Sequence, residues 1–343
     1  MFPNSPKFNI NKHPIFFYQN ILCLVICQYL KNQREDHEIS FLIKTIFFAL
    51  NNLFLRAELV LMLVILLSNE VKIGIYLANH GITSNPQDYI KLAKSGEECG
   101  WDGFFLWDHV FLPWAPDQDV LDPWIMLSAI ATQTNKITLG TTVTPLARRR
   151  PMIIAREAIT IDRLSSGRFI LGVGLGGTAE LKALGEEEDP KIRGDILDES
   201  LEILKGLWSG NPFTFDGEHF KIKEPVKFTP EGKIKIWVGG EWPNKKPFRR
   251  AAKYDGIFPL KAGADPSVYP QDYQEIMSYI GKYRKSLEPF DFVKSIVTVG
   301  DKEEDAYIHD FMDMGVNWLL EAFWQERCSL KEIQKRIERG PPE

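Results

Sequence analysis

The stretch Arg168-Phe-Ile-Leu-Gly-Val-Gly-Leu-Gly-Gly177 has the pattern of a buried strand that ends in two adjacent glycines. A second run of the same design is Ile234-Lys-Ile-Trp-Val-Gly-Gly240. Glycine has no Cβ, so the backbone N–H groups at such a strand end can approach a ligand closely. In a closed barrel of parallel strands, the carboxyl ends share one face, where cofactor phosphates and active sites lie.

We therefore expect both glycine pairs to meet at one mouth and to donate N–H groups to a cofactor phosphate, helped by the hydroxyl of the next residue. These residues are Gly176, Gly177, Thr178, Gly239 and Gly240. The alternative interpretation is that the glycines only permit tight turns between strand and helix.

Strand-like and helix-like segments alternate from Val71 onwards. Strands that alternate with helices predict a parallel sheet, and eight such units predict a closed (β/α)8 barrel, the TIM barrel. An open Rossmann sheet is less favoured, because no G-x-G-x-x-G turn is followed by an acid about 20 residues later. The predicted strands are 71–78, 103–107, 137–143, 168–173, 234–238, 256–260, 293–299 and 316–320. The predicted helices are 86–99, 122–134, 152–164, 192–208, 248–254, 270–285, 303–314 and 330–339.

Two local signals sharpen this assignment. Asp122 and Pro123 have the residue types of an N-cap and a first helical position, so they predict the start of the second helix. An Asp-Gly turn within 213–222 predicts a β-hairpin outside the barrel.

Residues 1–70 differ from the rest of the chain, because none of the 25 glycines lies there. We predict an extension of uncertain order over 1–70 and a barrel domain over 71–343. This pattern disfavours a membrane association, since charged residues interrupt the long apolar run and Leu59–Leu67 is too short to span a bilayer. Met62 is a plausible later start site.

The composition excludes several classes of protein. A net charge of −5 disfavours a nucleic-acid partner. The four cysteines have no paired metal-ligand spacing, and the six histidines form neither H-x-H nor H-E-x-x-H, so we expect no metal site. We expect a location in the reducing cytoplasm.

Asp108 and His109 follow the second predicted strand. A carboxylate and an imidazole at the catalytic face can bind a ring edge or move a proton, because histidine titrates near neutrality. The plainer alternative is that both side chains are hydrogen-bonded to the backbone.

Arg148, Arg149 and Arg150 form a basic run. It is either part of a solvated loop or attracts the anionic tail of a coenzyme. Glu180 lies just beyond the first glycine pair. Its carboxyl group acts either as a catalytic acid or as a negative charge at the N-terminus of a helix.

The order of these motifs resembles the luciferase-like monooxygenases over about residues 71–335. The segments that carry the resemblance are Trp107-Asp-His109, Gly140-Thr-Thr-Val-Thr144, Arg150-Pro151, Asp162-Arg-Leu-Ser-Ser-Gly-Arg168, Gly172-Val-Gly-Leu-Gly-Gly177, Trp237-Val-Gly-Gly240, Arg250-Ala-Ala-Lys-Tyr-Asp-Gly256 and Gly315-Val-Asn-Trp318. The resemblance implies a (β/α)8 barrel that uses either FMN with oxygen or coenzyme F420, an 8-hydroxy-5-deazaflavin, for hydride transfer.

The resemblance also implies roles for particular residues. In deazaflavin-dependent relatives, a pair matching Asp108 and His109 contacts coenzyme and substrate. A bulge with a non-proline cis peptide at Thr142-Val143 is expected to back the central flavin ring. The resemblance is also compatible with a homodimer, since many members of the family form dimers.

We therefore predict an oxidoreductase that transfers hydride or oxygen between its cofactor and a small organic substrate, with His109 as the catalytic residue. The cofactor is F420 or, close behind it, FMN. The alternatives are an FMN-dependent monooxygenase, a non-catalytic flavin-binding protein of the same fold, and an unrelated lyase or aldolase barrel. The last would need a Schiff-base lysine, for which Lys261 is the candidate.

Overall fold

The computed structural model describes residues 71–263, 265–298, 302–324 and 326–342, with only the backbone described at 302–307. The predicted N-terminal extension, 1–70, lies outside the described residues. Among the helices of the described part, none has the length and apolar character needed to cross a membrane.

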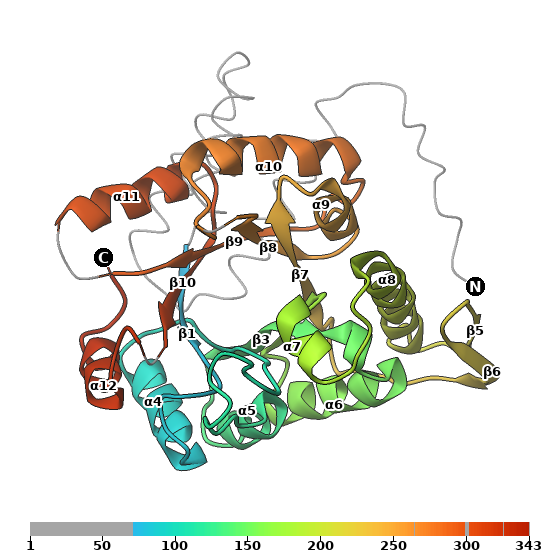
Figure 1. Cartoon of the computed structure of the whole chain (residues 1–343), viewed down its shortest axis with the longest axis horizontal. Coiled ribbons are helices and arrows are strands. Elements are labelled where there is room, and N and C mark those ends of the chain that lie inside the picture. Colours follow the sequence, from blue (N-terminus) through green and yellow to red (C-terminus); the bar gives the residue numbers. More distant parts are fainter. Residues whose placement is uncertain (1–70, 264, 299–301, 325, 343) are drawn as a thin grey trace, which may run out of the picture. The chain divides into compact units, whose positions relative to one another are not determined.

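The predicted barrel is confirmed, because eight parallel strands close on one another in the order β1-β10-β9-β8-β7-β4-β3-β2 (Figure 1). Every step follows chain order, as expected for repeated strand-helix units. The barrel strands are β1 (Lys72–Leu77), β2 (Gly103–Leu106), β3 (Thr138–Pro145), β4 (Phe169–Gly174), β7 (Lys235–Trp242), β8 (Gly256–Lys261), β9 (Asp291–Ile296) and β10 (Trp318–Phe323).

Helices cover the outside of the strand ring, and many of them begin where the sequence predicts. Asp122 caps α5 by accepting hydrogen bonds from the backbone N–H groups of Trp124 and Ile125, with Pro123 as the first helical residue. Proline at this position costs no helical hydrogen bond. The helices are α4 (Pro86–Glu98), α5 (Pro123–Ala131), α6 (Pro151–Leu164), α7 (Thr178–Ala183), α8 (Pro190–Leu207), α9 (Lys245–Ala251), α10 (Pro270–Tyr283), α11 (Lys302–Asp313) and α12 (Leu330–Glu338), with a short 3-10 turn at Leu146–Arg148.

Aromatic rings fill the inside of the barrel. Phe105 stacks on Trp237 with ring centroids 5.0 Å apart, and Trp318 meets Trp237 edge-on at 5.3 Å. Tyr76 and Val143 pack against this buried cluster. The interior is therefore a packed core, and ligands have access only above it, at the ends of the strands.

Several local features differ from the predicted boundaries. The strand predicted at 234–238 is β7 and runs on to Trp242, so Gly239 and Gly240 lie within it and not after it. The strand predicted at 293–299 is β9 and covers Asp291–Ile296. The third strand runs on to Pro145, beyond the predicted end at residue 143. The predicted hairpin is present as β5 (Phe213–Asp216) and β6 (Lys221–Val226), with a longer second strand than expected. The loop after β4 contains the six-residue helix α7, too short to be detected from its pattern.

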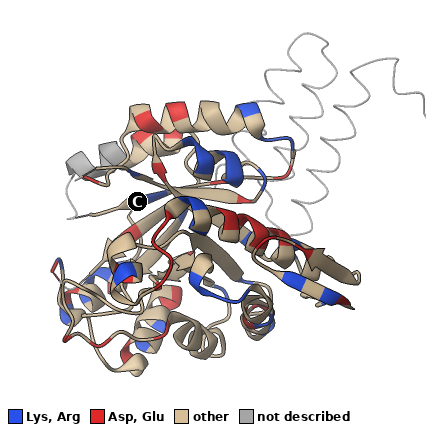
Figure 2. Cartoon of the chain, turned by 45° about the vertical axis from the view of Figure 1, so that its right-hand side comes forward, with Lys and Arg blue, Asp and Glu red and all other residues tan. Residues whose placement is uncertain are grey.

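Charged residues of both signs are interspersed over the outer helices and the hairpin (Figure 2). This mixed surface agrees with the small net charge of −5. Long-range attraction to the protein as a whole is therefore weak, and ligand selection depends on local groups.

Candidate active site at the carboxyl ends of the strands

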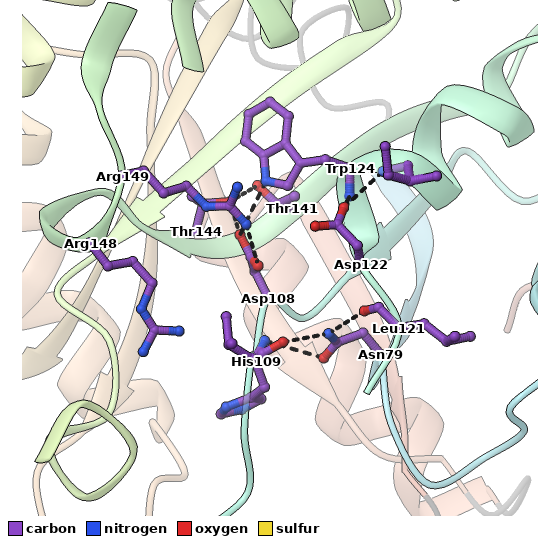
Figure 3. A network of polar contacts seen from close by, with 12 residues as sticks. Asn79, Asp108, His109, Leu121, Asp122, Trp124, Thr141, Thr144, Arg148 and Arg149 are labelled. Carbon is purple, nitrogen blue, oxygen red and sulfur yellow. Dashed lines mark hydrogen bonds and ion pairs between the residues drawn. The ribbon is translucent and has the colours of Figure 1, made fainter. Parts of the chain in front are cut away.

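Asp108 lies at the carboxyl end of β2 and is closed off from solvent, with its side chain 1% exposed. Its carboxylate accepts hydrogen bonds from Thr144 Oγ1 at 2.8 Å, Trp124 Nε1 at 3.1 Å and Arg149 Nη2 at 2.9 and 3.0 Å. Figure 3 shows these donors converging on Asp108 from β3, α5 and the loop after β3. The aspartate therefore holds three segments of the rim together.

The solvated-loop interpretation of the arginine run is wrong for Arg148 and Arg149. Arg149 pairs with Asp108, and Arg148 donates to Glu180 Oε1 at 2.9 Å and to Glu186 Oε2 at 3.0 Å. The Arg148 side chain is only 4% exposed. Arg148 Nη2 and Arg149 Nε are buried without a partner among the described residues, and the attraction for an anionic coenzyme tail stays a prediction.

His109, the predicted catalytic residue, points away from Asp108 (Figure 3) and stays accessible, with 24% of its side chain exposed. Its Nδ1 lies 3.0 Å from Glu180 Oε2. Because an ionised carboxylate can only accept, Nδ1 carries the proton, and Nε2 of the neutral ring is left as an acceptor. Within the described part of the chain, no hydrogen bond is made to Nε2.

Glu180 is the residue that fixes this arrangement. Besides His109 and Arg148, its carboxylate accepts from the backbone N–H groups of Val110 at 2.7 Å and Phe111 at 3.2 Å. Burial alone would raise the pKa of Glu180, but the hydrogen bonds from His109, Val110 and Arg148 lower it to about 2. The glutamate is therefore ionised throughout the physiological range and keeps His109 in one tautomer.

The predicted cis peptide is present at Thr142-Val143, and the pairing of β3 with β4 shifts register between Thr141 and Thr144. The Tyr76 hydroxyl donates to the Thr142 carbonyl at 2.9 Å. Thr142 Oγ1 is buried and has no hydrogen-bond partner among the described residues. A buried hydroxyl without a partner is costly unless a ligand supplies one.

The structure brings both glycine pairs to one rim, because β4 and β7 are neighbouring strands with Val173 level with Val238. A Cβ on Gly239 would lie 2.7 Å from Val143 Cγ1, and one on Gly240 would lie 2.3 Å from Pro247 Cβ. These two glycines are therefore required by packing within the chain. They lie inside β7 and have no positive φ, so the tight-turn alternative does not describe them.

The first pair is more open. Gly176 has a φ of +80°, a conformation that favours glycine, and a Cβ on Gly177 would meet nothing within 4 Å. Arg193 of α8 lies beneath this turn and donates to the Gly176 carbonyl at 3.0 Å and to Thr178 Oγ1 at 2.9 Å. The turn is thus held by a buried cation.

Sequence reasoning missed Arg193 as a support for the turn and gave Glu180 no partner. The signal for Glu180 was its place three residues beyond Gly177. The lysine required for a lyase or aldolase mechanism is unsuitable, because Lys261 Nζ pairs with Asp272 Oδ2 at 2.9 Å and its side chain is not buried. Within the described residues, no group of three or more His, Cys, Asp or Glu side chains could hold a metal ion.

The family model described as luciferase-like monooxygenase matches residues 63–336. The chain belongs to this family. The resemblance noted from the sequence motifs is therefore confirmed, and with it the predicted fold.

One curated relative is an F420-dependent glucose-6-phosphate dehydrogenase of Microbacterium testaceum (strain StLB037), 32% identical over 193 residues, which are 54% of this chain and 56% of that protein. The match thus spans only about half of the relative's length. Among solved structures, an F420-dependent secondary alcohol dehydrogenase in complex with an F420-acetone adduct has a TM-score of 0.58 and 21% identity, with 78% of this chain and 81% of that chain covered. The oxygenating constituent of the 3,6-diketocamphane monooxygenase of Pseudomonas putida, in complex with FMN, has a TM-score of 0.55 and 20% identity, with 71% of each chain covered.

Proposed function

We propose that this protein is an F420-dependent oxidoreductase that transfers a hydride between the coenzyme and a small organic substrate. The observation that carries the proposal is His109, whose Nδ1 is fixed by Glu180 while Nε2 stays available at the mouth of the barrel. A histidine in this state suits proton transfer to or from a substrate oxygen. The F420-dependent relatives support the choice of coenzyme.

The residues at the mouth suit a flat ring with a phosphate tail. Val143 and Tyr76 top the apolar interior and offer a floor for the ring, and Thr142 Oγ1 offers a free hydroxyl beside it. The open turn at Gly176, Gly177 and Thr178 has backbone N–H groups and the Arg193 cation beneath it, which suit a phosphate. Gly239 and Gly240 extend this rim on the neighbouring strand.

Asp108 has a different role in this proposal. Its carboxylate oxygens already accept from three side chains, so we assign it to positioning the rim rather than to direct contact with the coenzyme. Trp107 and His109 then follow a rigid strand end, and their rings are held 5.8 Å apart.

F420, when bound, supplies the hydride acceptor or donor. In the oxidation of an alcohol, His109 Nε2 takes the hydroxyl proton as the C–H bond gives up its hydride. The resulting imidazolium is stabilised by the Glu180 carboxylate, since the two groups are 3.0 Å apart. In the reverse direction the same Nε2–H protonates the carbonyl oxygen.

A fluorescence titration of the purified protein with F420 and, in parallel, with FMN tests the proposal. We expect tight binding of F420, followed by turnover of the bound coenzyme with an organic substrate. Tight binding of neither would refute the proposal, and binding of F420 without turnover would point to a non-catalytic flavin-binding protein.

An FMN-dependent monooxygenase is the second candidate, because a structural neighbour holds FMN in the same fold. This alternative predicts tight FMN binding and oxygen consumption with reduced FMN.

We also propose a cytoplasmic location, supported by the free thiols of Cys99 and Cys328.

A further inference from the structure

Three buried polar groups beside His109 have no hydrogen-bond partner among the described residues. His80 is only 4% exposed, and both of its ring nitrogens are unpaired. Trp107 Nε1 and Gln118 Oε1 are likewise buried and unpaired, and His80 and Gln118 share no hydrogen bond of normal geometry. Buried polar groups are nearly always paired, so this cluster indicates a place where a ligand supplies the partners.

The cluster adjoins the proton-transfer residue. The His80 ring centroid lies 5.7 Å from that of Trp107 and 5.5 Å from that of His109. A substrate oxygen that meets His109 Nε2 therefore lies near the His80 and Trp107 rings, and Gln118 is a neighbour of His80. Neutral imidazole offers one donor and one acceptor, the indole one donor, and the amide oxygen one acceptor.

The surrounding backbone is firmly held, so the unpaired atoms do not result from a loose loop. The Asn79 amide donates to the carbonyls of His109 and Leu121, both at 2.8 Å. His80 and Val120 form a β-bridge, and the Leu121 N–H donates to the Asn79 carbonyl at 2.9 Å. The end of β1 and the loop after β2 are thus joined before any ligand arrives.

The charges around the cluster disfavour an anion. The two nearby arginines are each paired with carboxylates, Arg149 with Asp108 and Arg148 with Glu180 and Glu186, although Arg148 Nη2 and Arg149 Nε are buried without a hydrogen-bond partner among the described residues. Burial, and next the neighbouring His109, lower the pKa of His80, while contact with the Gln118 side chain and then the carboxylates of Glu326 and Glu180 act in the opposite direction. His80 is therefore neutral near pH 7, and the charges facing it include two carboxylates.

We propose that His80, Trp107 and Gln118 form a neutral polar subsite that binds the hydroxyl or carbonyl oxygens of an uncharged substrate, and that it discriminates against phosphate esters. This inference rests on the proposed function, because it specifies the substrate class for the same site. It separates this chain from the F420-dependent glucose-6-phosphate dehydrogenases to which it is similar, since their substrate is a phosphorylated sugar.

The test compares two uncharged compounds with phosphate esters that keep a free hydroxyl: glucose with glucose 6-phosphate, and cyclohexane-1,4-diol with its monophosphate. Steady-state rates are measured with F420 for the wild type, His80→Phe and Trp107→Phe. The second variant keeps an aromatic ring and removes the indole N–H together with its five-membered ring, and it covers the case where His80→Phe does not fold. His219→Phe, the same exchange in the hairpin outside the barrel, is the matched control.

We expect the uncharged member of each pair to be the better substrate by at least tenfold in kcat/KM. His80→Phe should raise KM for it about tenfold while the Kd for F420 stays within twofold, since about 1.4 kcal/mol corresponds to a factor of ten. His219→Phe should change neither constant. A preference for the phosphate esters, or an unchanged KM in both subsite variants, would overturn the inference.

A direct binding measurement keeps this result separate from the proposed function. In protein labelled with ¹⁵N-histidine, the ring signals assigned to His80 should shift with cyclohexane-1,4-diol and not with its monophosphate. If this holds while F420 does not bind, the subsite stands and the proposed hydride transfer fails. If F420 binds and turns over while the His80 signals respond only to the phosphate ester, the subsite is refuted and the proposed function stands.

Discussion

The two ends of the barrel treat their buried polar groups differently. At the amino end, Asp291 accepts hydrogen bonds from Lys235 Nζ and Trp237 Nε1, both at 2.9 Å, and Asp255 accepts from the Ile236 N–H at 2.9 Å. At the carboxyl end, His80, Trp107 and Thr142 keep buried atoms without partners, whereas at the amino end Asp162 Oδ2, beside the start of β4, is an exception to the pairing. The paired groups at the amino end contribute to stability, while the carboxyl end leaves several polar groups available for ligands.

The same contrast appears within the carboxyl end, between neighbours in the sequence. Asp108 has its oxygens occupied by Thr144, Trp124 and Arg149, whereas His109 gives one nitrogen to Glu180 and keeps the other available. A paired group shapes the rim, and a half-paired group can react. The predictions below test this division.

The largest effect is expected for His109→Ala. Loss of a positioned general acid-base group should reduce kcat by about 10²- to 10⁴-fold, because proton transfer to the substrate oxygen then depends on water. The Kd for F420 should change little. The measurement is single-turnover reduction of F420 by an uncharged alcohol, with His219→Ala as the control at a histidine outside the barrel. Activity within threefold of wild type would remove His109 from the mechanism.

At the opposite end, Asp291→Ala should reduce stability without affecting chemistry. The buried Trp237 N–H would lose its acceptor, which costs about 2 to 3 kcal/mol in the free energy of unfolding. Urea denaturation followed by tryptophan fluorescence measures this loss, and Asp291→Asn, which keeps one acceptor, should recover part of it. A lower kcat in the folded Asp291→Ala protein would contradict the division between the two ends.

Glu180→Gln tests whether the charge of Glu180, the residue that positions His109, makes protein stability depend on pH. The pKa of Glu180 is lowered from 4.5 to about 2, so its ionisation contributes stability that is fully present above pH 4.5 and is lost as the pH falls towards 2. The contribution is on the order of 2 to 3 kcal/mol. The difference in unfolding free energy between wild type and Glu180→Gln should therefore be large at pH 6 and shrink at pH 3.

Glu180→Gln should also change the pH dependence of kcat/KM, which a purely structural role of Glu180 would leave unchanged. Without the carboxylate, the His109 imidazolium loses its stabilising partner, so the pH at which kcat/KM reaches half its maximum should move downwards. A pH profile measured with the same alcohol tests this shift. An unchanged profile, or a stability difference that is constant from pH 6 to pH 3, would show that Glu180 does not act through its charge on His109.

The fold could be predicted from the sequence because its signals are local. Each apolar run, each proline after a capping residue and each glycine at a strand end lies within a few positions of the feature that it specifies. The Asp122 and Pro123 start of α5 is confirmed for this reason.

The site was predicted only in part, because its pairings join distant segments. His109 and Glu180 are 71 positions apart, and Asp108 and Arg149 are 41 apart. Nothing in the basic run 148–150 indicates that two of its members are buried against carboxylates of other strands. The unpaired nitrogens of His80 likewise exist only once β1, β2 and their loops are folded together.

The smallest effect concerns a residue that the sequence did identify. Asp122→Ala removes the side chain that caps α5, next to the Trp124 indole that binds Asp108. Loss of an N-cap costs about 1 kcal/mol. Because the indole is also held by its buried packing, we expect kcat and the Kd for F420 to stay within twofold of wild type. Urea denaturation measures the stability loss, and Ser329→Ala, which removes the N-cap of α12, should lower the free energy of unfolding by a similar amount. If Asp122→Ala lowers kcat tenfold and Ser329→Ala does not, the α5 cap belongs to the functional end of the barrel, and the boundary between stabilising and reacting groups must be drawn farther from His109, beyond Asp122.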